Sequence, residues 1–208
     1  MTGRDIPDPA EAKRGRPFSE KTEAAILSAT SELLAEKDLA DITIEEVAAR
    51  AHVGKASVYR RWSSKGTLAF DAFEREFLAR QPLPATGELR GDLLAAMRSW
   101  VRTVRDTPTG RTLRGLIAEV QRDPALQGIW RDRFIGPVRS QHRQMVDRAI
   151  ARGEIAPETD PDLVMDLLYG AAYHRLLQGH LPLNDQFVRA LVDAVMSVTT
   201  TPRRDAPG

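Results

Sequence analysis

The chain has 208 residues, a formal net charge of +1, 42% hydrophobic and 28% charged residues, and no cysteine. This composition suits a soluble globular protein, and the lack of cysteine excludes disulfides, thiolate metal sites and cysteine nucleophiles. No window approaches the roughly 18 unbroken apolar residues of a membrane span, and the polar N-terminus lacks the apolar core of a signal peptide. We therefore expect a cytoplasmic protein without a membrane partner.

Helical periodicity dominates the N-terminal part, and no segment shows the alternation expected of a strand. Ser19 can cap a first helix, whose apolar residues between Ile26 and Leu34 fall on one face. Thr43 and Glu46 then have the spacing of a capping box, in which each side chain bonds a free backbone amide at the other residue. A second helix is therefore predicted to begin directly after Thr43.

A short basic helix is predicted to follow a tight turn at residues 52–54. It runs from about residue 55 to residue 62, and Ser64 caps a long fourth helix after it. The segment from residue 47 to residue 70 has no acidic residue, and its cations are Arg50, Lys55, Arg60, Arg61 and Lys65. A helical hairpin with one basic helix fits the major groove of DNA, which is bordered by phosphates. The sequence thus predicts a helix-turn-helix that binds double-stranded DNA.

Further helices follow the run Gln81-Pro82-Leu83-Pro84, which breaks the pattern and marks the predicted domain boundary. Gly153 is predicted to end one of these helices as a C-cap, and Asp160 to begin another. The expected helices span about residues 88–106, 109–122, from 124, 137–152, 161–178 and 184–198.

The predicted fold class is therefore all-α, with about nine helices. We expect a flexible basic arm at residues 1–17, a helix-turn-helix domain with a linking fourth helix at 18–80, a helical bundle at 81–200, and a disordered tail at 201–208.

The predicted helix at residues 161–178 is apolar nearly all round between Leu163 and Tyr173. Burial on both sides indicates either the centre of a large bundle or a core on one side and a second subunit on the other. We favour a homodimer, in which the last helix completes a four-helix interface. The predicted interface residues are Val164, Leu167, Leu168, Ala171, His174, Arg175, Phe187, Leu191, Ala194 and Val195.

The hairpin resembles the tetracycline-repressor (TetR) family of bacterial transcription regulators. The resemblance covers about residues 18–70. It is carried by Ile42-Thr43-Ile44-Glu45-Glu46-Val47-Ala48, by Val53-Gly54-Lys55-Ala56-Ser57-Val58-Tyr59-Arg60-Arg61-Trp62 and by Ser64-Lys65-Gly66-Thr67-Leu68. A weaker similarity lies in Leu168-Tyr169-Gly170-Ala171-Ala172-Tyr173-His174-Arg175-Leu176-Leu177. The resemblance implies a homodimeric repressor that binds a palindromic operator and releases it when a small molecule fills the C-terminal domain.

Three positions depart from the family pattern. His52 stands where the turn usually has glycine, and histidine tolerates the positive φ required there. Asp38 stands where glycine commonly ends the first helix, and we expect it also to take the left-handed conformation. Gly54 replaces the Ser or Thr that often caps the recognition helix, at a loss of about 0.5 kcal/mol.

The resemblance assigns Thr43, Tyr59, Arg61 and Lys65 to DNA phosphates. Hydroxyls and cations at helix N-termini and along a groove edge hold the DNA backbone without reading sequence. Gly54 adds to this set because it leaves backbone amides of the recognition helix open to phosphate.

The first turn of the recognition helix is predicted to contact base edges through Lys55, Ala56 and Ser57. Lys55 suits the acceptors of guanine and Ala56 the methyl group of thymine. Arg60 suits either a base or a phosphate, and Trp62 is expected to pack inside the hairpin.

Two further cations, Arg14 and Arg16, precede the first helix. They fit an arm that enters the adjacent minor groove, and they also fit an ordinary disordered basic tail.

The C-terminal domain is expected to hold a small-molecule effector through a population shift that changes the spacing of the recognition helices. Trp100, Tyr169 and Tyr173 stand out because buried aromatic N–H and O–H groups supply a ligand's few polar contacts. The predicted pocket residues are Met97, Trp100, Val101, Leu116, Val120, Trp130, Phe134, Met145, Tyr169 and Tyr173.

Two other classes of function are an enzyme and a ligand-independent or architectural DNA-binding protein. An enzyme is disfavoured because the four histidines are scattered and no HExxH, GxSxG or Gly-rich phosphate loop is present. We therefore expect no catalytic residue, no metal and no cofactor. The other class is a ligand-independent or architectural DNA-binding protein, which would bind without preference for a palindrome.

Overall fold

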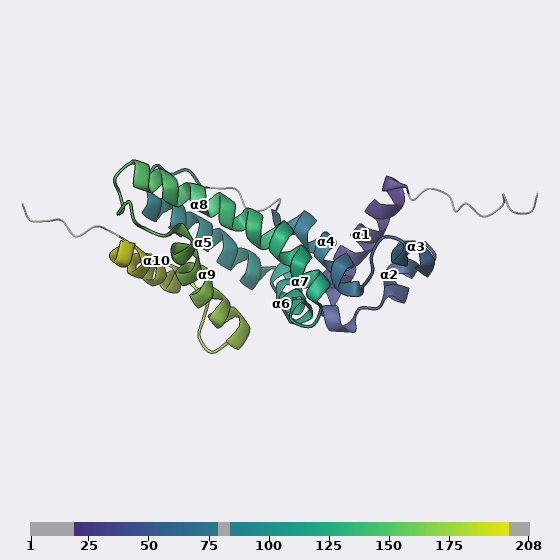
Figure 1. Ribbon diagram of the computed structural model, residues 1–208. Helices are drawn as coiled ribbons and strands as arrows, with labels where there is room; N and C mark the ends of the chain where they lie inside the picture. The colour runs from purple at the N-terminus through teal and green to yellow at the C-terminus, as the bar shows by residue number, and fades with distance from the viewer. Residues whose placement is uncertain (1–18, 79–83, 200–208) are drawn as a thin grey trace, which may run out of the picture.

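The structure is a computed structural model, and it describes residues 19–78 and 84–199. These residues form helices joined by short loops, and no strand occurs among them. Figure 1 shows α2 and α3 at one end of an elongated molecule and α10 toward the other, with α4, α6 and α7 between them. The all-α fold expected from helical periodicity is confirmed.

The N-terminal helices begin where their capping residues predict. Ser19 accepts a hydrogen bond from the Thr22 amide at 3.2 Å, and the reciprocal bonds between Thr43 and Glu46 are both present. The Thr67 amide donates to Ser64 Oγ at 3.2 Å, as expected of a cap on the fourth helix. The elements are α1 (Glu20–Glu36), a 3-10 turn η1 (Leu39–Asp41), α2 (Ile44–Arg50), α3 (Lys55–Tyr59) and α4 (Lys65–Leu78).

Two local predictions for this part are wrong, and one is confirmed. Asp38 is extended at φ −68° and ψ 148° and not left-handed, because the chain leaves α1 through an extended Lys37 into the 3-10 turn. The recognition helix ends at Tyr59 and not at Trp62. His52 does take positive φ, at 55°, and makes the sharp turn between α2 and α3.

The C-terminal helices also follow their start and stop signals. Asp160 accepts from the Asp162 amide at 2.8 Å, Gly153 and Gly179 take positive φ, and Asn184 caps the last helix by accepting from the Phe187 amide at 2.9 Å. The elements are α5 (Leu89–Asp106), α6 (Pro108–Val120), α7 (Pro124–Trp130), a π-helical segment η2 (Arg131–Ile135), α8 (Gly136–Ala151), α9 (Pro161–Gln178) and α10 (Asp185–Thr199).

The helices α7 and α8 were expected to be separate, but η2 joins them into one continuous rod. The Gly136 amide donates to the carbonyl of Arg131, five residues back. A proline lacks the amide that an interior helical position supplies, and the wider turn directly before Pro137 accommodates it. Counted in this way, the parts of the chain that the structure describes form nine helical rods.

A single hydrophobic core runs through both halves of the molecule. Helix α4 packs against α1 on one side and against α6 on the other. Arg111 of α6 donates to the carbonyls of Leu34 (3.0 Å) and Ala35 (2.6 Å) at the end of α1, whose own last turn has no basic residue. The helix-turn-helix is therefore held to the bundle by α4 and α6. Most of the predicted boundary at 81–84 lies outside the described residues.

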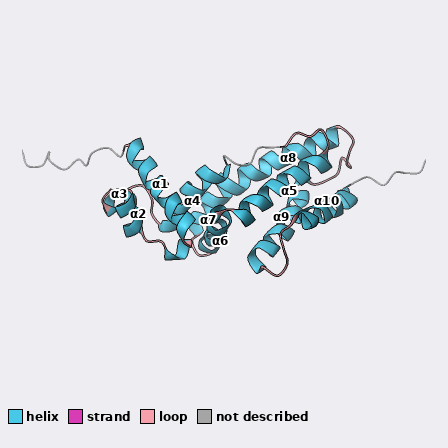
Figure 2. Cartoon of the chain, turned by 180° about the vertical axis from the view of Figure 1, so that it is seen from behind, coloured by secondary structure: helices cyan, strands magenta, loops and turns pink. Residues whose placement is uncertain are grey.

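The far end of the molecule carries an exposed stripe along α9, which is apolar except for His174. Leu163, Leu167, Gly170, His174 and Leu177 recur every three or four residues, and all are exposed in the single chain. This spacing places them on one helical face, as in the seam between two packed helices. We call these five residues the α9 stripe. Figure 2 shows α9 and α10 side by side at this end.

Three of the predicted interface residues, Val164, Leu168 and Val195, lie instead in the core of the protomer. Each is at most 3% exposed, so none has surface left for a partner. They occupy the inward face of their helices, which an all-round apolar pattern does not distinguish from the outward face. None of the described helices is long and apolar enough to cross a membrane.

Candidate nucleic-acid interface and internal cavity

Buried apolar side chains hold the helix-turn-helix against the core of the domain. Val58 is fully buried and Trp62 is 3% exposed, which confirms that Trp62 packs inside the hairpin. Gly54 begins α3 without a side-chain cap, at an exposed position. The short helix is thus held by its buried face and not by its own hydrogen bonds, since five residues are too few to be stable alone.

The outward face of α3 carries the side chains predicted to meet DNA. Lys55, Ala56, Tyr59 and Arg60 are exposed, with Tyr59 at 49%. The Arg60 guanidinium donates to Ser57 Oγ at 3.0 Å, and Lys55 Nζ lies 5.6 Å from the centre of the Tyr59 ring. Helix α3 and its C-cap Arg60 therefore present two cations, two hydroxyls and a methyl group together, a mixture suited to base edges and phosphates.

Three of the five cations in residues 47–70 have acidic partners ten or more residues away in the sequence. Arg50 lies 2.6 Å from Glu36 of α1. Lys55 forms an ion pair with Glu45 of α2, and Arg61 lies 3.5 Å from Glu23 of α1. The hydrogen bond from Lys55 lowers the pKa of Glu45, and the same bond raises the pKa of Lys55. The cationic segment predicted from the sequence is therefore partly neutralised by carboxylates of α1 and α2.

The other predicted phosphate contacts are tied into the domain. Lys65 Nζ donates to the carbonyl of Ala40 at 2.9 Å, and the Thr43 hydroxyl donates to the Glu46 carboxylate at 3.0 Å. Lys37 approaches the same carboxylate at 2.5 Å, and its hydrogen bond, helped by those from Thr43, lowers the pKa of Glu46 to about 2. Arg14 and Arg16 lie outside the described residues.

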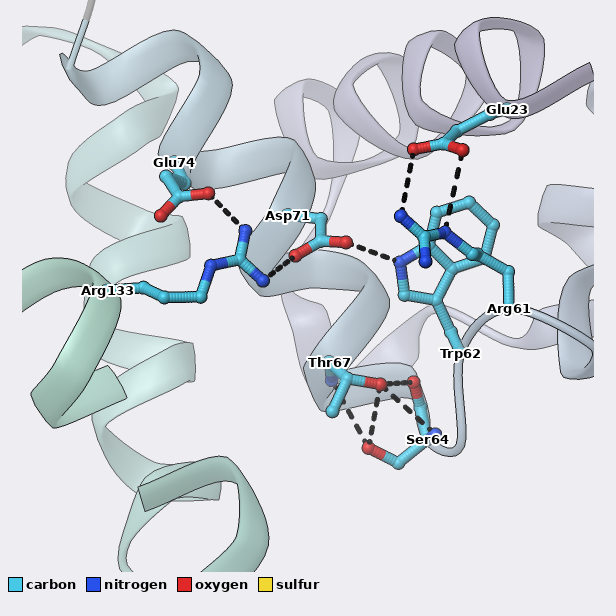
Figure 3. A network of polar contacts seen from close by, with 8 residues as sticks. All are labelled: Glu23, Arg61, Trp62, Ser64, Thr67, Asp71, Glu74 and Arg133. Atoms are coloured by element: carbon cyan, nitrogen blue, oxygen red, sulfur yellow. Dashed lines mark hydrogen bonds and ion pairs between the residues drawn. The ribbon is translucent and has the colours of Figure 1, made fainter. Parts of the chain in front are cut away.

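A chain of polar contacts links the hairpin to the C-terminal bundle (Figure 3). The Trp62 indole N–H donates to Asp71 of α4 at 2.8 Å, and the same carboxylate lies 3.0 Å from Arg133 of η2. Arg133 also pairs with Glu74 of α4, and its guanidinium lies 5.1 Å from the centre of the Phe70 ring. Sequence reasoning missed this network because its members have no shared local pattern.

Beside the network, aromatic rings from α4, α7 and η2 form one cluster. Phe73 stacks on Phe77 with ring centres 5.0 Å apart, and Phe134 meets the two edge-on at 5.4 and 5.2 Å. Trp130 lies 4.5 Å from Phe134. Phe134 directly follows Arg133, so adjacent residues of η2 contact the rings and the carboxylates of α4.

A partly open cavity of about 430 Å³ lies next to this cluster. Its walls come from α5, η2, α8 and α9, with Phe77 of α4 at one end. The lining residues are Phe77, Pro84, Ala96, Trp100, Phe134, Ile135, Pro137, Val138, Arg139, Gln141, His142, Met165, Asp166, Tyr169, Gly170 and Tyr173.

Four of the predicted pocket residues line this cavity, namely Trp100, Phe134, Tyr169 and Tyr173. The other six are buried packing residues of the core, because they face neighbouring helices and not the cavity: Met97, Val101, Leu116, Val120, Trp130 and Met145. Sequence reasoning missed His142 and Arg139, which also line the cavity. Both are polar residues on a helix with many polar residues, so the sequence does not distinguish them from exposed side chains.

The cavity wall holds a compact set of neutral polar groups. Tyr169 Oη lies 3.0 Å from His142 Nε2, and His142 Nδ1 lies 2.7 Å from the carbonyl of Val138. Burial lowers the pKa of His142 and raises that of Tyr169. Burial likewise raises the pKa of Tyr173 to about 12, despite an opposing hydrogen bond from Trp100. All of these groups are therefore uncharged at neutral pH.

The remaining predicted interface residues differ in exposure. Leu167, His174 and Ala194 are exposed, whereas Ala171, Arg175, Phe187 and Leu191 are half-buried. Arg175 is used within the chain, since it donates to the Pro182 carbonyl at 2.8 Å and lies 3.8 Å from the centre of the Phe187 ring.

A helix-turn-helix that packs its apolar face against a helical bundle defines a class of protein, the DNA-binding transcription regulator. Two family models match the chain: "Bacterial regulatory proteins, tetR family" over residues 26–72, and "Tetracyclin repressor-like, C-terminal domain" over residues 83–195. The chain belongs to the TetR family of bacterial transcription regulators.

Named relatives extend this similarity over most of the chain. The HTH-type transcriptional regulator YdeS of Bacillus subtilis is 36% identical, over 88% of this chain and 91% of its own length. The DNA-binding transcriptional repressor TetR of Mycobacteroides abscessus is 33% identical, over 88% of this chain and 96% of its own. Among solved structures, the TetR family transcription regulator SCO0332 has a TM-score of 0.75 and 35% identity, covering 88% of this chain and all of its own.

Family membership confirms that the chain is a DNA-binding transcription regulator with a helix-turn-helix. It also confirms that the chain is not an enzyme, because regulators of this family are non-enzymatic DNA-binding factors.

Proposed function

We propose that this protein is a homodimeric repressor in the cytoplasm that binds a palindromic operator through α3 and releases it when a small molecule fills the cavity. The observation that carries the proposal is that one helix, α4, touches both sites. Asp71 at its middle accepts a hydrogen bond from Trp62 of the hairpin, and Phe77 near its end lines the cavity.

The proposed DNA contacts follow the chemistry of the exposed face of α3. Lys55, Ala56 and Ser57 meet base edges, while Arg60 meets either a base or a phosphate. The remaining contacts hold the DNA backbone. These are Arg14, Arg16, Thr43, Gly54, Tyr59, Arg61 and Lys65.

The dimer is proposed to form across the α9 stripe, with the outer face of α10 beside it. The stripe is supported as an interface by its exposed leucines, Leu163 at 55%, Leu167 at 41% and Leu177 at 46%, which a monomer would leave in water. Gly170 at its centre has open space where a Cβ would stand, so a second helix can approach closely. A two-fold axis there would make the two α3 helices equivalent.

The response to ligand is proposed to pass through η2. A ligand against Phe134 and Ile135 displaces the segment that carries Arg133. Arg133 in turn holds Asp71 and Glu74 of α4, so the tilt of α4 and of the attached hairpin follows. A ligand shifts this equilibrium only as far as it binds one tilt better than the other.

Selection of bound sequences from a random pool of DNA duplexes tests the proposal. We expect recovery of inverted repeats whose half-sites lie one or more helical turns apart. Sedimentation of the complex should show one or more dimers on each duplex. Recovery of sequences without two-fold symmetry would instead support an architectural DNA-binding protein.

A further inference from the structure

We infer that the cavity takes a neutral, flat aromatic ligand of two or three rings, which donates a hydrogen bond to the hydroxyl oxygen of Tyr169. This inference rests on the proposed ligand-responsive function and specifies its ligand. It is carried by the directions of the hydrogen bonds in the cavity wall, by the rings that line it and by the pairing of its charges.

The hydrogen bonds around Tyr169 have only one consistent direction. The backbone carbonyl of Val138 can only accept, and it lies 2.7 Å from His142 Nδ1, so Nδ1 carries the proton of the ring. The buried ring is neutral, which leaves Nε2 as an acceptor. Tyr169 Oη lies 3.0 Å from Nε2 and therefore donates its only proton there.

Tyr169 lines the cavity, and its oxygen consequently has lone pairs but no proton to offer to a ligand there. A buried acceptor that gains no donor on ligand binding costs free energy. A ligand hydroxyl or N–H satisfies it, whereas a ligand group that only accepts, such as an ether oxygen, meets another acceptor. Tyr169 thus selects for a donor, although a tyrosine hydroxyl is ordinarily able to serve either kind of partner.

The rings around this point favour a flat apolar body. Trp100 meets Tyr169 and Tyr173 edge-on, with ring centres 5.8 and 5.3 Å apart and interplanar angles of 84° and 69°. Phe134 adds a further ring to the lining. Aromatic pairs favour offset-stacked or edge-to-face contact, which flat rings achieve best. A volume of about 430 Å³ lies near the lower end for small-molecule sites, which suits two or three rings.

The two charged residues that line the cavity, Arg139 and Asp166, form an ion pair with each other. Arg139 lies 2.7 Å from Asp166 and 3.0 Å from Asp162, and among the lining residues that the structure describes only Arg139 and Asp166 are ionised. Asp166 is exposed, so this pair lies at the rim. An ionic ligand would leave water without a counter-charge inside the cavity, which strongly disfavours it.

Calorimetric titration of the full chain with four naphthalenes of one shape tests the inference. The series is 2-naphthol, 2-methoxynaphthalene, 2-naphthoate and 2-naphthylmethylammonium at pH 7.5. We expect 2-naphthol to bind at least about fivefold more tightly than the methyl ether, the gain typical of one hydrogen bond. It should bind at least about tenfold more tightly than either ion.

Two variants test the direction of the hydrogen bond. His142→Leu removes the group that holds the Tyr169 proton, so the methyl ether should bind more tightly and approach 2-naphthol to within about twofold. Tyr169→Phe should weaken 2-naphthol about fivefold and leave the methyl ether unchanged. Gln144→Leu, at an exposed position of α8 outside the cavity, is the matched control and should alter neither affinity.

Equal binding of the ether or of either ion to the wild type, or no binding by 2-naphthol, would overturn the inference. The same compounds are then added to the protein bound to its selected DNA. Tight binding of 2-naphthol without release of DNA would leave the ligand class standing and contradict the ligand-responsive function.

Discussion

The DNA-facing hairpin and the cavity satisfy their polar groups in opposite ways. At the hairpin, Lys55 and Arg61 are paired with carboxylates in water, and another acceptor can replace each carboxylate at little cost. In the cavity, Tyr169 and His142 satisfy one another away from water, so a ligand must match a fixed pattern. The comparison teaches that exposed ion pairs, whose carboxylates can be replaced, suit the binding of a polyanion. A buried hydrogen bond of fixed direction suits the binding of one kind of small molecule.

The largest effect is expected from breaking the dimer on which DNA recognition depends. Leu163→Glu with Leu167→Glu places four carboxylates in the proposed two-fold contact, so the protein should sediment as a monomer. Affinity for the selected DNA should fall about a hundredfold or more, because one half-site is lost. Leu181→Glu, an exposed leucine in the loop before α10, is the control. A dimer that persists in the double variant would refute the α9 stripe as the interface.

Removing a phosphate contact should act on all DNA sequences alike. Lys65→Ala is expected to weaken specific and random duplexes equally and to flatten the salt dependence by about one unit of slope for each protomer bound. The measurement is affinity against salt concentration. Thermal melting controls for the lost bond to the Ala40 carbonyl. An unchanged slope would remove Lys65 from the phosphate contacts.

The link between the two regions should depend on Arg133. Arg133→Met keeps the apolar stem but removes the bonds to Asp71 and Glu74, so ligand should change DNA affinity less than about threefold. Ligand affinity measured without DNA should stay within about threefold of the wild type. Arg131→Met, on the same π-helical segment but paired only with its neighbour Asp132, is the matched control. Equal coupling in the two variants would exclude the proposed route.

A smaller gain is expected from freeing the first cation of α3. Glu45→Gln removes the partner of Lys55, so affinity for any duplex should rise about threefold at low salt, and the gain should shrink as salt increases. Glu158→Gln makes the same change of charge at an exposed site between α8 and α9. A similar gain from Glu158→Gln would mean that total charge, and not the local pair, determines affinity.

The smallest effect concerns stability below neutral pH. Burial lowers the pKa of His142 from its ordinary 6.5, so the unfolded chain binds this proton more readily than the folded chain. The stabilising contribution of the neutral ring is complete above pH 6.5 and is lost as the pH falls from there toward the lowered value. The melting temperature should therefore decline in this range, and less steeply in His142→Gln. Parallel curves would show that His142 is not the group responsible.

Local features of the sequence determined the helices and their ends. Ser19, Thr43, Asp160 and Asn184 cap helices because each capping bond joins residues two or three apart, which adjacent sequence alone specifies. The same holds for the recognition helix and for the basic side chains on it, since their exposure follows from helical period. The exposure of the predicted DNA-contact side chains could be predicted in this way, and their contacts with DNA stay a prediction.

Only the tertiary structure decided which side chains meet across the fold. Nothing near Asp71 in the sequence indicates Arg133, and nothing near His142 indicates Tyr169, because these contacts depend on how helices far apart in the chain pack together. Packing also chose between equally apolar residues, placing Val164 in the core and Leu163 on the surface. A period of 3.6 residues marks a helix, but which side of an all-apolar helix turns inward is decided by its neighbours.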